Sequence, residues 1–283
     1  MAFLGHTARK RFGQHWLTDA SILDRIIAAA DLQPHDRVLE VGPGKGALTA
    51  RLLTSQVAAV HAVELDRDLV TGLRKRFGDE PRFTLQEGDA LSVSLKLPDG
   101  INANKVVANI PYNITGPLLE RLVGRLSRPA ESHYQLLVLL LQKEVADRIL
   151  ANPGQSSFSA LSVRLQLIAR CRRVCQVPPR CFEPPPKVDS EVIVLEPIQP
   201  EKRLDPVLAS RVDNLLRKAF VARRKMLRNT LKGLSSCIEL DALAKEARIS
   251  LQQRPQELSS AEWLALARSL NRAEGLVEND EHF

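Results

Sequence analysis

The chain lacks the apolar segments that would place it in or across a membrane. Among its 283 residues the densest apolar run, Leu136–Leu141, is far shorter than the ~20 residues that a spanning helix needs. The first residues, Met1–His6, lack the long apolar core of a signal peptide. We therefore expect a cytoplasmic protein without a membrane partner, and the 44% of apolar residues predicts a well-packed core.

Cysteine is scarce and has no metal-binding pattern. None of the four cysteines belongs to a Cys-x-x-Cys pair, and none has a histidine at the spacing of a zinc finger: Cys171, Cys175, Cys181 and Cys237. We expect reduced thiols, as in cytosolic proteins, and no metal site. The chain also lacks Gly-x-x-x-x-Gly-Lys-Ser/Thr, so the sequence argues against a P-loop in spite of Lys45.

Acidic residues are missing from two segments of a chain whose net charge is +7. No acid precedes Asp19, and the arm before it contains Arg9, Lys10 and Arg11. None occurs at 214–238, which holds seven cations: Arg217, Lys218, Arg223, Arg224, Lys225, Arg228 and Lys232. These ten cations outnumber the net charge of +7, so the basicity of the chain is concentrated in these two segments. Such a concentration is typical of a surface that binds a phosphate backbone.

Apolar residues recur at helical spacing through the second basic segment, at Val212, Leu216, Phe220, Leu227 and Leu231. We therefore predict a helix over about 206–233 that buries one face and exposes its cations. Charge alone leaves two alternatives to RNA open, namely a merely solvated helix face and an anionic membrane surface.

A glycine-rich loop, Gly42–Gly46, follows a predicted strand, Arg37–Val41, and precedes a helical run, Ala47–Leu53. Glycines let the backbone pass close beneath a ligand. The spacing is Gly-x-Gly-x-Gly, and an acid, Glu40, stands two residues before the first glycine. The loop therefore differs from the dinucleotide motif Gly-x-Gly-x-x-Gly, although an NAD-type fold remains the alternative at this point.

Two acids follow at the ends of the next predicted strands. Glu64 comes 22 residues after Gly42, where its carboxylate can accept from both hydroxyls of a ribose. Asp89 follows the strand Phe83–Glu87 and can accept from an adenine amino group. A glycine loop, an acid that can bind the ribose and an acid that can bind the adenine base, in this order, predict a site for S-adenosylmethionine.

Asn109-Ile110-Pro111-Tyr112 follows a fourth predicted strand. The amino nitrogen of adenine is a weak nucleophile because its lone pair is delocalised into the ring. The Asn109 side-chain oxygen and the Ile110 carbonyl can each accept one amino hydrogen, which favours a pyramidal nitrogen close to the transition state. Pro111 stiffens the turn, and Tyr112 offers a face on which an unstacked base can lie. An ordinary strand-to-turn corner is the alternative for these four residues alone.

Together these motifs resemble the KsgA (RsmA) family of ribosomal RNA small-subunit adenine dimethyltransferases, over about residues 9 to 270. The segments that carry the resemblance are 9–14, 40–44, 63–66, 109–113, 141–144, 182–190, 219–220 and 223–225. The chain has His15-Trp16 where the family usually has Asn-Phe, and Leu17 is retained. In the family the position of His15 touches the cofactor, so a backbone contact is expected there.

The resemblance implies dimethylation of the N6 amino group of two adjacent adenines near the 3′ end of 16S ribosomal RNA, with S-adenosyl-L-methionine as cofactor. It also implies binding to immature small subunits during their biogenesis, and we expect a monomer when the protein is free. We assign catalysis to Asn109, Ile110, Pro111, Tyr112 and Phe182, with Phe182 as a second stacking face. We assign cofactor binding to His15, Leu17, Gly42, Gly44, Glu64, Asp89, Ala90 and Asn109, and RNA binding to Arg9, Lys10, Arg11, Lys187, Arg223, Arg224, Lys225 and Arg228.

The order of elements predicts an α/β fold, a Rossmann-like S-adenosylmethionine-dependent methyltransferase sheet followed by a small all-α domain. We expect strands near 37–41, 57–64, 83–87, 105–109, 134–141, 167–177 and 190–196. By resemblance the last strand is antiparallel and inserted between neighbours. We predict a methyltransferase domain at 1–197 and a helical, basic RNA-binding domain at 205–283, with helices near 206–233, 239–247 and 260–272 and a fraying tail after Arg272.

Two other functions stay open from sequence. One is a methylase of the same fold that acts on large-subunit RNA. The other is an RNA-binding assembly factor, or a transcription factor derived from this fold, without catalysis. The intact Asn109–Tyr112 motif argues against the second, and the triple proline at 184–186 with the basic C-terminal segment argues against the first.

Overall fold

The structure is a computed structural model that describes residues 8–9, 13–128, 130, 134–234 and 240–280. The chain forms two compact units. The first comprises 1–124, 130–146 and 170–197, and the second comprises 125–129, 147–169 and 198–283. The last boundary between the two units, at Pro197, coincides with the end of the predicted first domain. Two segments that the prediction placed in the first domain, 125–129 and 147–169, belong instead to the second unit. The reason is packing, since helix α6 (Ala160–Ile168) contacts α7 (Pro206–Phe220) and α10 (Ser260–Asp280).

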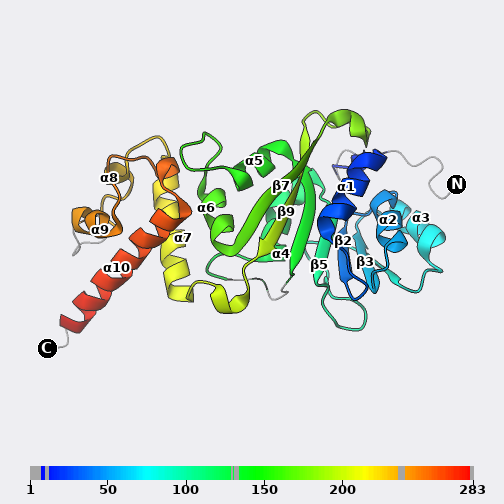
Figure 1. The fold of residues 1–283 in the computed structure, drawn as a ribbon, viewed down its shortest axis with the longest axis horizontal. Helices are drawn as coiled ribbons and strands as arrows, with labels where there is room; N and C mark the ends of the chain where they lie inside the picture. The colour runs from blue at the N-terminus through cyan, green and yellow to red at the C-terminus, as the bar shows by residue number, and fades with distance from the viewer. Residues whose placement is uncertain (1–7, 10–12, 129, 131–133, 235–239, 281–283) are drawn as a thin grey trace. The chain divides into compact units, whose positions relative to one another are not determined.

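The first unit is built on a seven-stranded sheet with strand order β4-β3-β2-β5-β6-β9-β7 (Figure 1). Its strands are β2 (Arg37–Val41), β3 (Ala59–Glu64), β4 (Phe83–Glu87), β5 (Lys105–Asn109), β6 (Leu136–Gln142), β7 (Ala169–Val177) and β9 (Ser190–Pro197). Strands β2 to β6 pair in parallel, and β9 is antiparallel to β6. The predicted α/β class and the inserted antiparallel strand are confirmed.

Strands β2, β5, β6 and β9 are buried along most of their length, as expected for strands that are covered on both faces. The helices of this unit are α1 (Ala20–Ala30), α2 (Ala47–Thr54), α3 (Arg67–Phe77) and α4 (Thr115–Val123), and α5 (Lys143–Leu150) spans the boundary between the units. Asp19 and Asp66 begin α1 and α3 by accepting backbone N–H bonds, which satisfies helix donors that otherwise lack partners.

A buried ion pair joins the starts of β2 and β5. The Lys105 ammonium lies 2.7 Å from Asp36 and also donates to the carbonyls of Ala30 and Asp31, at 3.0 and 2.6 Å. Burial by itself raises the pKa of Asp36, but hydrogen bonds from Lys105, Gln33 and Asn104 outweigh it and lower this pKa. The pair thus fixes the edge of the sheet opposite the carboxyl ends of its strands.

A second, two-stranded sheet fixes the N-terminal segment. Strand β1 (Trp16–Leu17) pairs antiparallel with β8 (Phe182–Glu183), with Trp16 opposite Glu183 and Leu17 opposite Phe182. Residues opposite each other share a face of a sheet. Leu17 and Phe182 therefore both enter the core, where each is 4% exposed, while Trp16 faces the other way.

The second unit is helical, and α10 lies against α7 in it (Figure 1). Its other helices after Pro197 are α8 (Leu227–Thr230) and α9 (Leu240–Ala247). Trp263 is fully buried, and its ring centroid lies 5.9 Å from that of Phe220. A capping box begins α10, because Glu262 accepts from the Ser259 backbone and the Ser259 hydroxyl accepts from the Glu262 N–H.

Two predictions for this unit were wrong. The helix expected over 206–233 ends at Phe220, and a separate short helix starts at Leu227. The N–H groups of Leu227 and Arg228 bond the carbonyls of Gln253 and Leu251, so tertiary hydrogen bonds replace helical ones there. Helix α10 also continues to Asp280, past the predicted end of this helix at Arg272. None of the described helices has the length and apolar character to cross a membrane.

Candidate active site

A cleft of ≈ 300 Å³ opens at the carboxyl ends of β2, β3 and β5. This edge of a parallel sheet is where α/β folds bind ligands. Its walls combine the N-terminal segment, the glycine loop, the two strand-end acids and the turn after β5. Predicted site residues that line it are His15, Gly42, Gly44, Glu64, Asp89, Ala90, Asn109, Ile110, Pro111 and Tyr112.

The glycines of the loop are required by both conformation and space. Gly42 and Gly44 have φ of +69° and +59°, which L side chains rarely adopt. A Cβ on Gly42 would lie 3.3 Å from the Pro111 ring, and one on Gly44 would lie 2.6 Å from Cδ1 of Trp16. The loop therefore passes close to Pro111 and to Trp16, and a side chain at either glycine would intrude into the cleft wall.

Glu64 is held by backbone donors at the end of β3. Its Oε2 accepts from the Gly44 N–H at 3.1 Å and its Oε1 from the Asp66 N–H at 2.9 Å, and the residue is 7% exposed. Burial raises the pKa of this carboxyl, although its backbone hydrogen bonds oppose that effect. The arrangement links the acid directly to the glycine loop.

Glu40 is a second buried acid behind the loop. It is 1% exposed, and its Oε2 accepts from the Thr49 hydroxyl at 2.7 Å. Burial raises its pKa to about 8, and the neighbouring charge of Glu64 adds to this shift. At neutral pH Glu40 is therefore mainly the neutral acid.

The turn after β5 presents its polar groups to the cleft. The Asn109 side-chain NH₂ donates to the His15 carbonyl at 3.1 Å, which orients its amide and leaves Oδ1 as the atom that can accept. The Ile110 N–H bonds the Leu140 carbonyl at 3.0 Å, so this backbone is tied to β6. Tyr112, which is half-buried, begins a short 3-10 turn after Pro111.

The side chain of His15 is engaged with protein groups. Its ring stacks on Tyr112, with centroids 5.6 Å apart and planes at 29°. Its Nδ1 lies 2.8 Å from the Pro184 carbonyl oxygen, and a carbonyl only accepts, so Nδ1 carries the proton. The His15 side chain is thus already engaged, and the backbone contact with the cofactor that the resemblance implies stays a prediction.

Two predicted site residues do not line the cleft. Leu17 and Phe182 point into the core of the first unit, because they face each other across β1 and β8 on the buried side. The prediction that the Phe182 ring stacks on the target base from the cleft is wrong for this conformation. Trp16, on the opposite side of β1, lines the cleft, and the Lys45 ammonium lies 4.0 Å from the centroid of its ring.

The predicted RNA-binding residues have different environments. Arg9 pairs with Asp66 at 2.9 Å and with Asp68 at 2.5 Å, so it holds the N-terminal segment onto the first unit. Lys10 and Arg11 lie outside the described residues. Lys187 is exposed, as are Arg228 in α8 and the basic turn, which we define as Arg223, Arg224 and Lys225. The basic turn lies between α7 and α8, so it is a turn and not the predicted helix.

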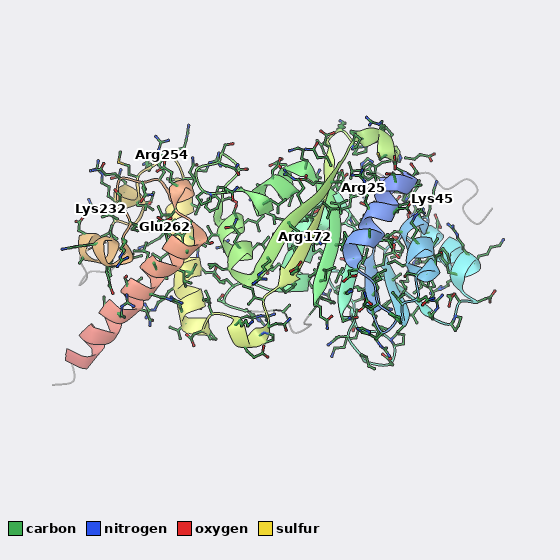
Figure 2. The ribbon with its side chains drawn as sticks, viewed as in Figure 1. Arg25, Lys45, Arg172, Lys232, Arg254 and Glu262 are labelled. Carbon is green, nitrogen blue, oxygen red and sulfur yellow. The ribbon has the colours of Figure 1, made fainter. Side chains whose placement is uncertain are left out.

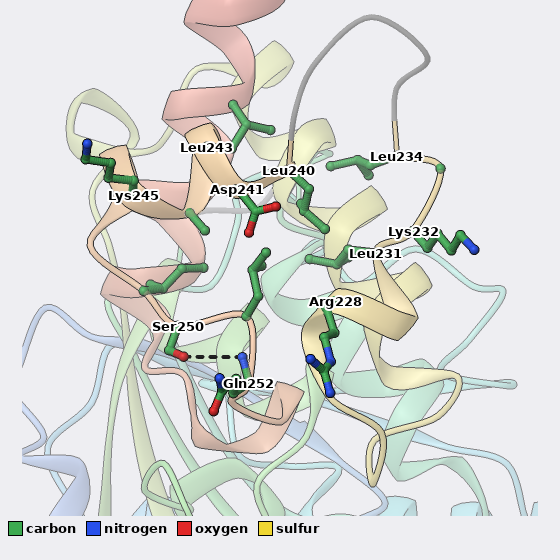
Figure 3. Close-up of a pocket in the computed structure, with 14 residues that line it drawn as sticks. Arg228, Leu231, Lys232, Leu234, Leu240, Asp241, Leu243, Lys245, Ser250 and Gln252 are labelled. Atoms are coloured by element: carbon green, nitrogen blue, oxygen red, sulfur yellow. Dashed lines mark hydrogen bonds between the residues drawn. The ribbon is translucent and has the colours of Figure 1, made fainter.

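A larger cavity of ≈ 630 Å³ lies in the second unit, among α8, α9 and the segment before Arg254 (Figure 3). Leucine side chains form much of its wall, and Arg228, Lys232 and Lys245 are its cations. Lys232 and Arg254 belong to the exposed cations of this unit (Figure 2). Arg228 is the one predicted site residue among its lining residues, and within the described residues no cluster of His, Cys, Asp and Glu suits a metal.

The cleft thus brings together the glycine loop, the two strand-end acids and the turn after β5. Residues 5–272 match the family model described as ribosomal RNA adenine dimethylase. The chain belongs to the ribosomal RNA adenine dimethylase family.

Curated relatives are similar to this protein over almost its whole length. A protein of Prochlorococcus marinus (strain MIT 9303) named ribosomal RNA small subunit methyltransferase A is 71% identical, over 97% of this chain and 98% of that protein. A protein of the same name from Parasynechococcus marenigrum (strain WH8102) is 66% identical over 282 residues. The predicted family and the predicted class of enzyme, an adenine dimethyltransferase, are confirmed.

Two solved structures have a similar fold over most of the chain. A dimethyladenosine transferase from Plasmodium falciparum is 29% identical with a TM-score of 0.77, over 91% of this chain and 98% of that one. The 23S rRNA methyltransferase ErmE is 25% identical with a TM-score of 0.72, over 90% and 99%. The ribosomal RNA adenine dimethylase fold thus includes both units of this chain.

Several cleft residues were not identified from the sequence. Gly13, Gln14 and Trp16 line it from the N-terminal segment, and Asn113 and Ile114 line it after the turn. Gly13 and Gln14 belong to the 9–14 segment, and Trp16 follows His15 in the sequence. Their closeness in sequence to His15 was the feature from which they could have been predicted. Ser190, which hydrogen-bonds the Tyr112 hydroxyl, lies 78 residues away in sequence, and no local pattern connects the two.

Proposed function

We propose that this protein dimethylates the N6 amino groups of two adjacent adenines near the 3′ end of 16S ribosomal RNA, as a step of small-subunit biogenesis in the cytoplasm. The observation that carries the proposal is the convergence of Asn109–Tyr112, the glycine loop and Glu64 on one cleft. The relatives named small subunit methyltransferase A support the choice of subunit. The substrate is an immature small subunit, which the protein meets as a monomer.

The residues of the cleft fit S-adenosyl-L-methionine. When bound, this cofactor supplies an electrophilic methyl group, so the protein itself needs no strong acid or base. Glu64 accepts from the ribose hydroxyls, and Asp89 accepts from the adenine amino group of the cofactor. Gly42 and Gly44 keep side chains out of the path of the ligand, as their close approach to Pro111 and Trp16 supports. His15 contributes its backbone.

The target adenine is held by the turn after β5. Asn109 Oδ1 accepts one amino hydrogen and the Ile110 carbonyl accepts the other, which orients the nitrogen lone pair along the line of transfer. Tyr112 supplies the stacking face. The orientation of the Asn109 amide by the His15 carbonyl supports this assignment, because it directs the acceptor atom and not the donor to the base.

Residues 205–283 bind the RNA through phosphate contacts. The exposed basic turn and Arg228 are the groups assigned to this role, with Lys187 in the first unit. Their exposure and the absence of acids from 214–238 support it. Arg9 is a weaker candidate, since Asp66 and Asp68 already bind its guanidinium.

One experiment separates the functions that remained open from sequence. Methyl transfer from labelled S-adenosyl-L-methionine is measured on immature small subunits, on large subunits and on naked ribosomal RNA. We expect transfer to the small subunit, to two adenines. Transfer confined to large subunits would identify a large-subunit methylase, to which the similarity with ErmE corresponds. Tight binding without any transfer would identify an assembly factor.

A variant tests the chemistry. Asn109→Ala removes one of two acceptors, and loss of one preorganised contact of this kind typically slows a reaction by ~10²–10³-fold. Single-turnover methylation is compared with subunit affinity, which should not change because the basic turn is intact. An Asn109→Ala variant that methylates at the parental rate would refute the role of this side chain.

A further inference from the structure

The Tyr112 side chain is held at both its hydroxyl and one ring face. Its hydroxyl forms a hydrogen bond with the Ser190 hydroxyl, and Ser190 is fully buried. Burial raises the pKa of Tyr112, so the phenol stays neutral and able to share a hydrogen bond. The His15 imidazole stacks on the ring.

The register of the sheet brings Ser190 to this position. Asn109, Leu140 and Val192 lie in one row across β5, β6 and β9, and Ser190 pairs with Gln142 two residues beyond that row. Because β9 is antiparallel, its first residue lies at the carboxyl edge of β5 and β6. Ser190 thus projects at the edge where Tyr112 begins the turn. The Lys143 N–H also bonds the Asp189 carbonyl at 2.9 Å, which fixes the start of β9.

The two contacts restrain different torsions of the same side chain. The Tyr112 hydroxyl lies on the axis of χ2, so the Ser190 bond cannot stop the ring from turning about this axis, but it prevents the swing of the whole ring about χ1. Stacking by His15 opposes rotation about χ2. The His15 ring is itself fixed by its Nδ1–H bond to Pro184. Together the contacts define one plane for the aromatic ring.

We propose that Ser190 is a positioning residue for methyl transfer, because its hydroxyl together with the His15 ring holds Tyr112 in the plane on which the target adenine stacks. This rests on the proposed function, in which Tyr112 is the stacking face. Ser190 contacts neither the base nor the transferred methyl group. Its effect reaches the reaction only through Tyr112.

The test compares four proteins with the parent: Ser190→Ala, Tyr112→Phe, the double variant, and Ser162→Ala as control. Ser162 is also a fully buried serine, and it donates to the Arg148 carbonyl in the second unit, so its loss measures the cost of a buried serine bond away from the cleft. Single-turnover methylation of immature small subunits is measured at saturating and at limiting subunit concentration, with thermal unfolding and S-adenosyl-L-methionine affinity.

We expect Ser190→Ala and Tyr112→Phe to slow single-turnover transfer at saturating subunit by about 3- to 10-fold each, the factor of one ordinary hydrogen bond. The double variant should be no slower than either single variant, since both changes remove the same bond. Cofactor affinity should match that of the parent. Ser162→Ala should lower the unfolding temperature without slowing transfer.

Other outcomes overturn the proposal. If Ser190→Ala loses thermal stability like Ser162→Ala but transfers at the parental rate, the serine is structural only. If the two rate losses multiply in the double variant, the residues act independently, and the link through the hydroxyl is wrong. A parental protein that transfers no methyl group to any RNA overturns the proposed function, and this inference with it.

Discussion

The buried acid behind the glycine loop makes the stability of the first unit dependent on pH. Glu40 is 1% exposed, and burial raises its pKa to about 8 from an ordinary 4.5. The perturbation is Glu40→Gln, which keeps an oxygen that can accept from the Thr49 hydroxyl but cannot ionise. The change therefore isolates the cost of charge at this position.

Proton linkage gives the sign and the size of the expected change in the free energy of unfolding with pH. Between pH 4.5 and 8 the unfolded chain has lost the proton of Glu40 and the folded chain has kept it. Stability contributed by the neutral acid is thus complete below pH 4.5 and falls as pH rises toward 8. One proton changes the free energy of unfolding by at most ~1.4 kcal/mol per pH unit, which amounts to about 3 kcal/mol at pH 7.

Urea unfolding of parent and variant at pH 5, 6, 7 and 8 is the assay. The advantage of Glu40→Gln over the parent should grow with each pH step by up to ~1.4 kcal/mol. Glu87→Gln is the control, because this exposed carboxylate pairs with Arg67 at the surface, and its difference from the parent should stay flat. An advantage of Glu40→Gln that does not change with pH would refute the assignment of a raised pKa.

Three further variants test other parts of the structure. Glu64→Ala should weaken S-adenosyl-L-methionine binding by ~1.5–3 kcal/mol, the value of a hydrogen bond to a charged group, and calorimetric titration that finds parental affinity would contradict the ribose assignment. Replacing the three residues of the basic turn by alanine should weaken subunit binding and make the affinity less dependent on salt concentration. The affinity for the cofactor should not change. If the affinity of the variant depends on salt as strongly as that of the parent, these residues do not contact the RNA. Lys105→Met leaves Asp36 buried without its cation, and urea unfolding should show a loss of about 3–5 kcal/mol, whereas no loss would mean that water reaches the carboxylate.

The sequence was sufficient for the sheet and for most of the cleft because both follow from local patterns. Strands β2, β3 and β5 are largely apolar and end at the glycine loop, at Glu64 and at Asn109, so their ends and the residues after them could be assigned. The inserted antiparallel β9 came from family resemblance, since no periodicity distinguishes a parallel strand from an antiparallel one when both faces are buried.

The errors arose where distant segments decide the structure. Phe182 was assigned to the cleft by resemblance, but its pairing with Leu17 turns the ring into the core. The helical period continues through Val221–Met226, yet hydrogen bonds from Leu227 and Arg228 to the segment before Arg254 end the helix there. The pairing of Arg9 was not predicted, because Asp66 and Asp68 are nearly 60 residues away in the sequence.

The distribution of tryptophan gives each unit its own optical probe. The chain contains two tryptophans: Trp16 lines the cleft of the first unit beneath the Lys45 ammonium, and Trp263 is fully buried in the second. Emission from Trp16 reports on what enters the cleft, while emission from Trp263 reports on the integrity of the helical unit. With either tryptophan replaced by phenylalanine, spectroscopy can follow ligand entry and the melting of the helical unit as separate signals in one polypeptide.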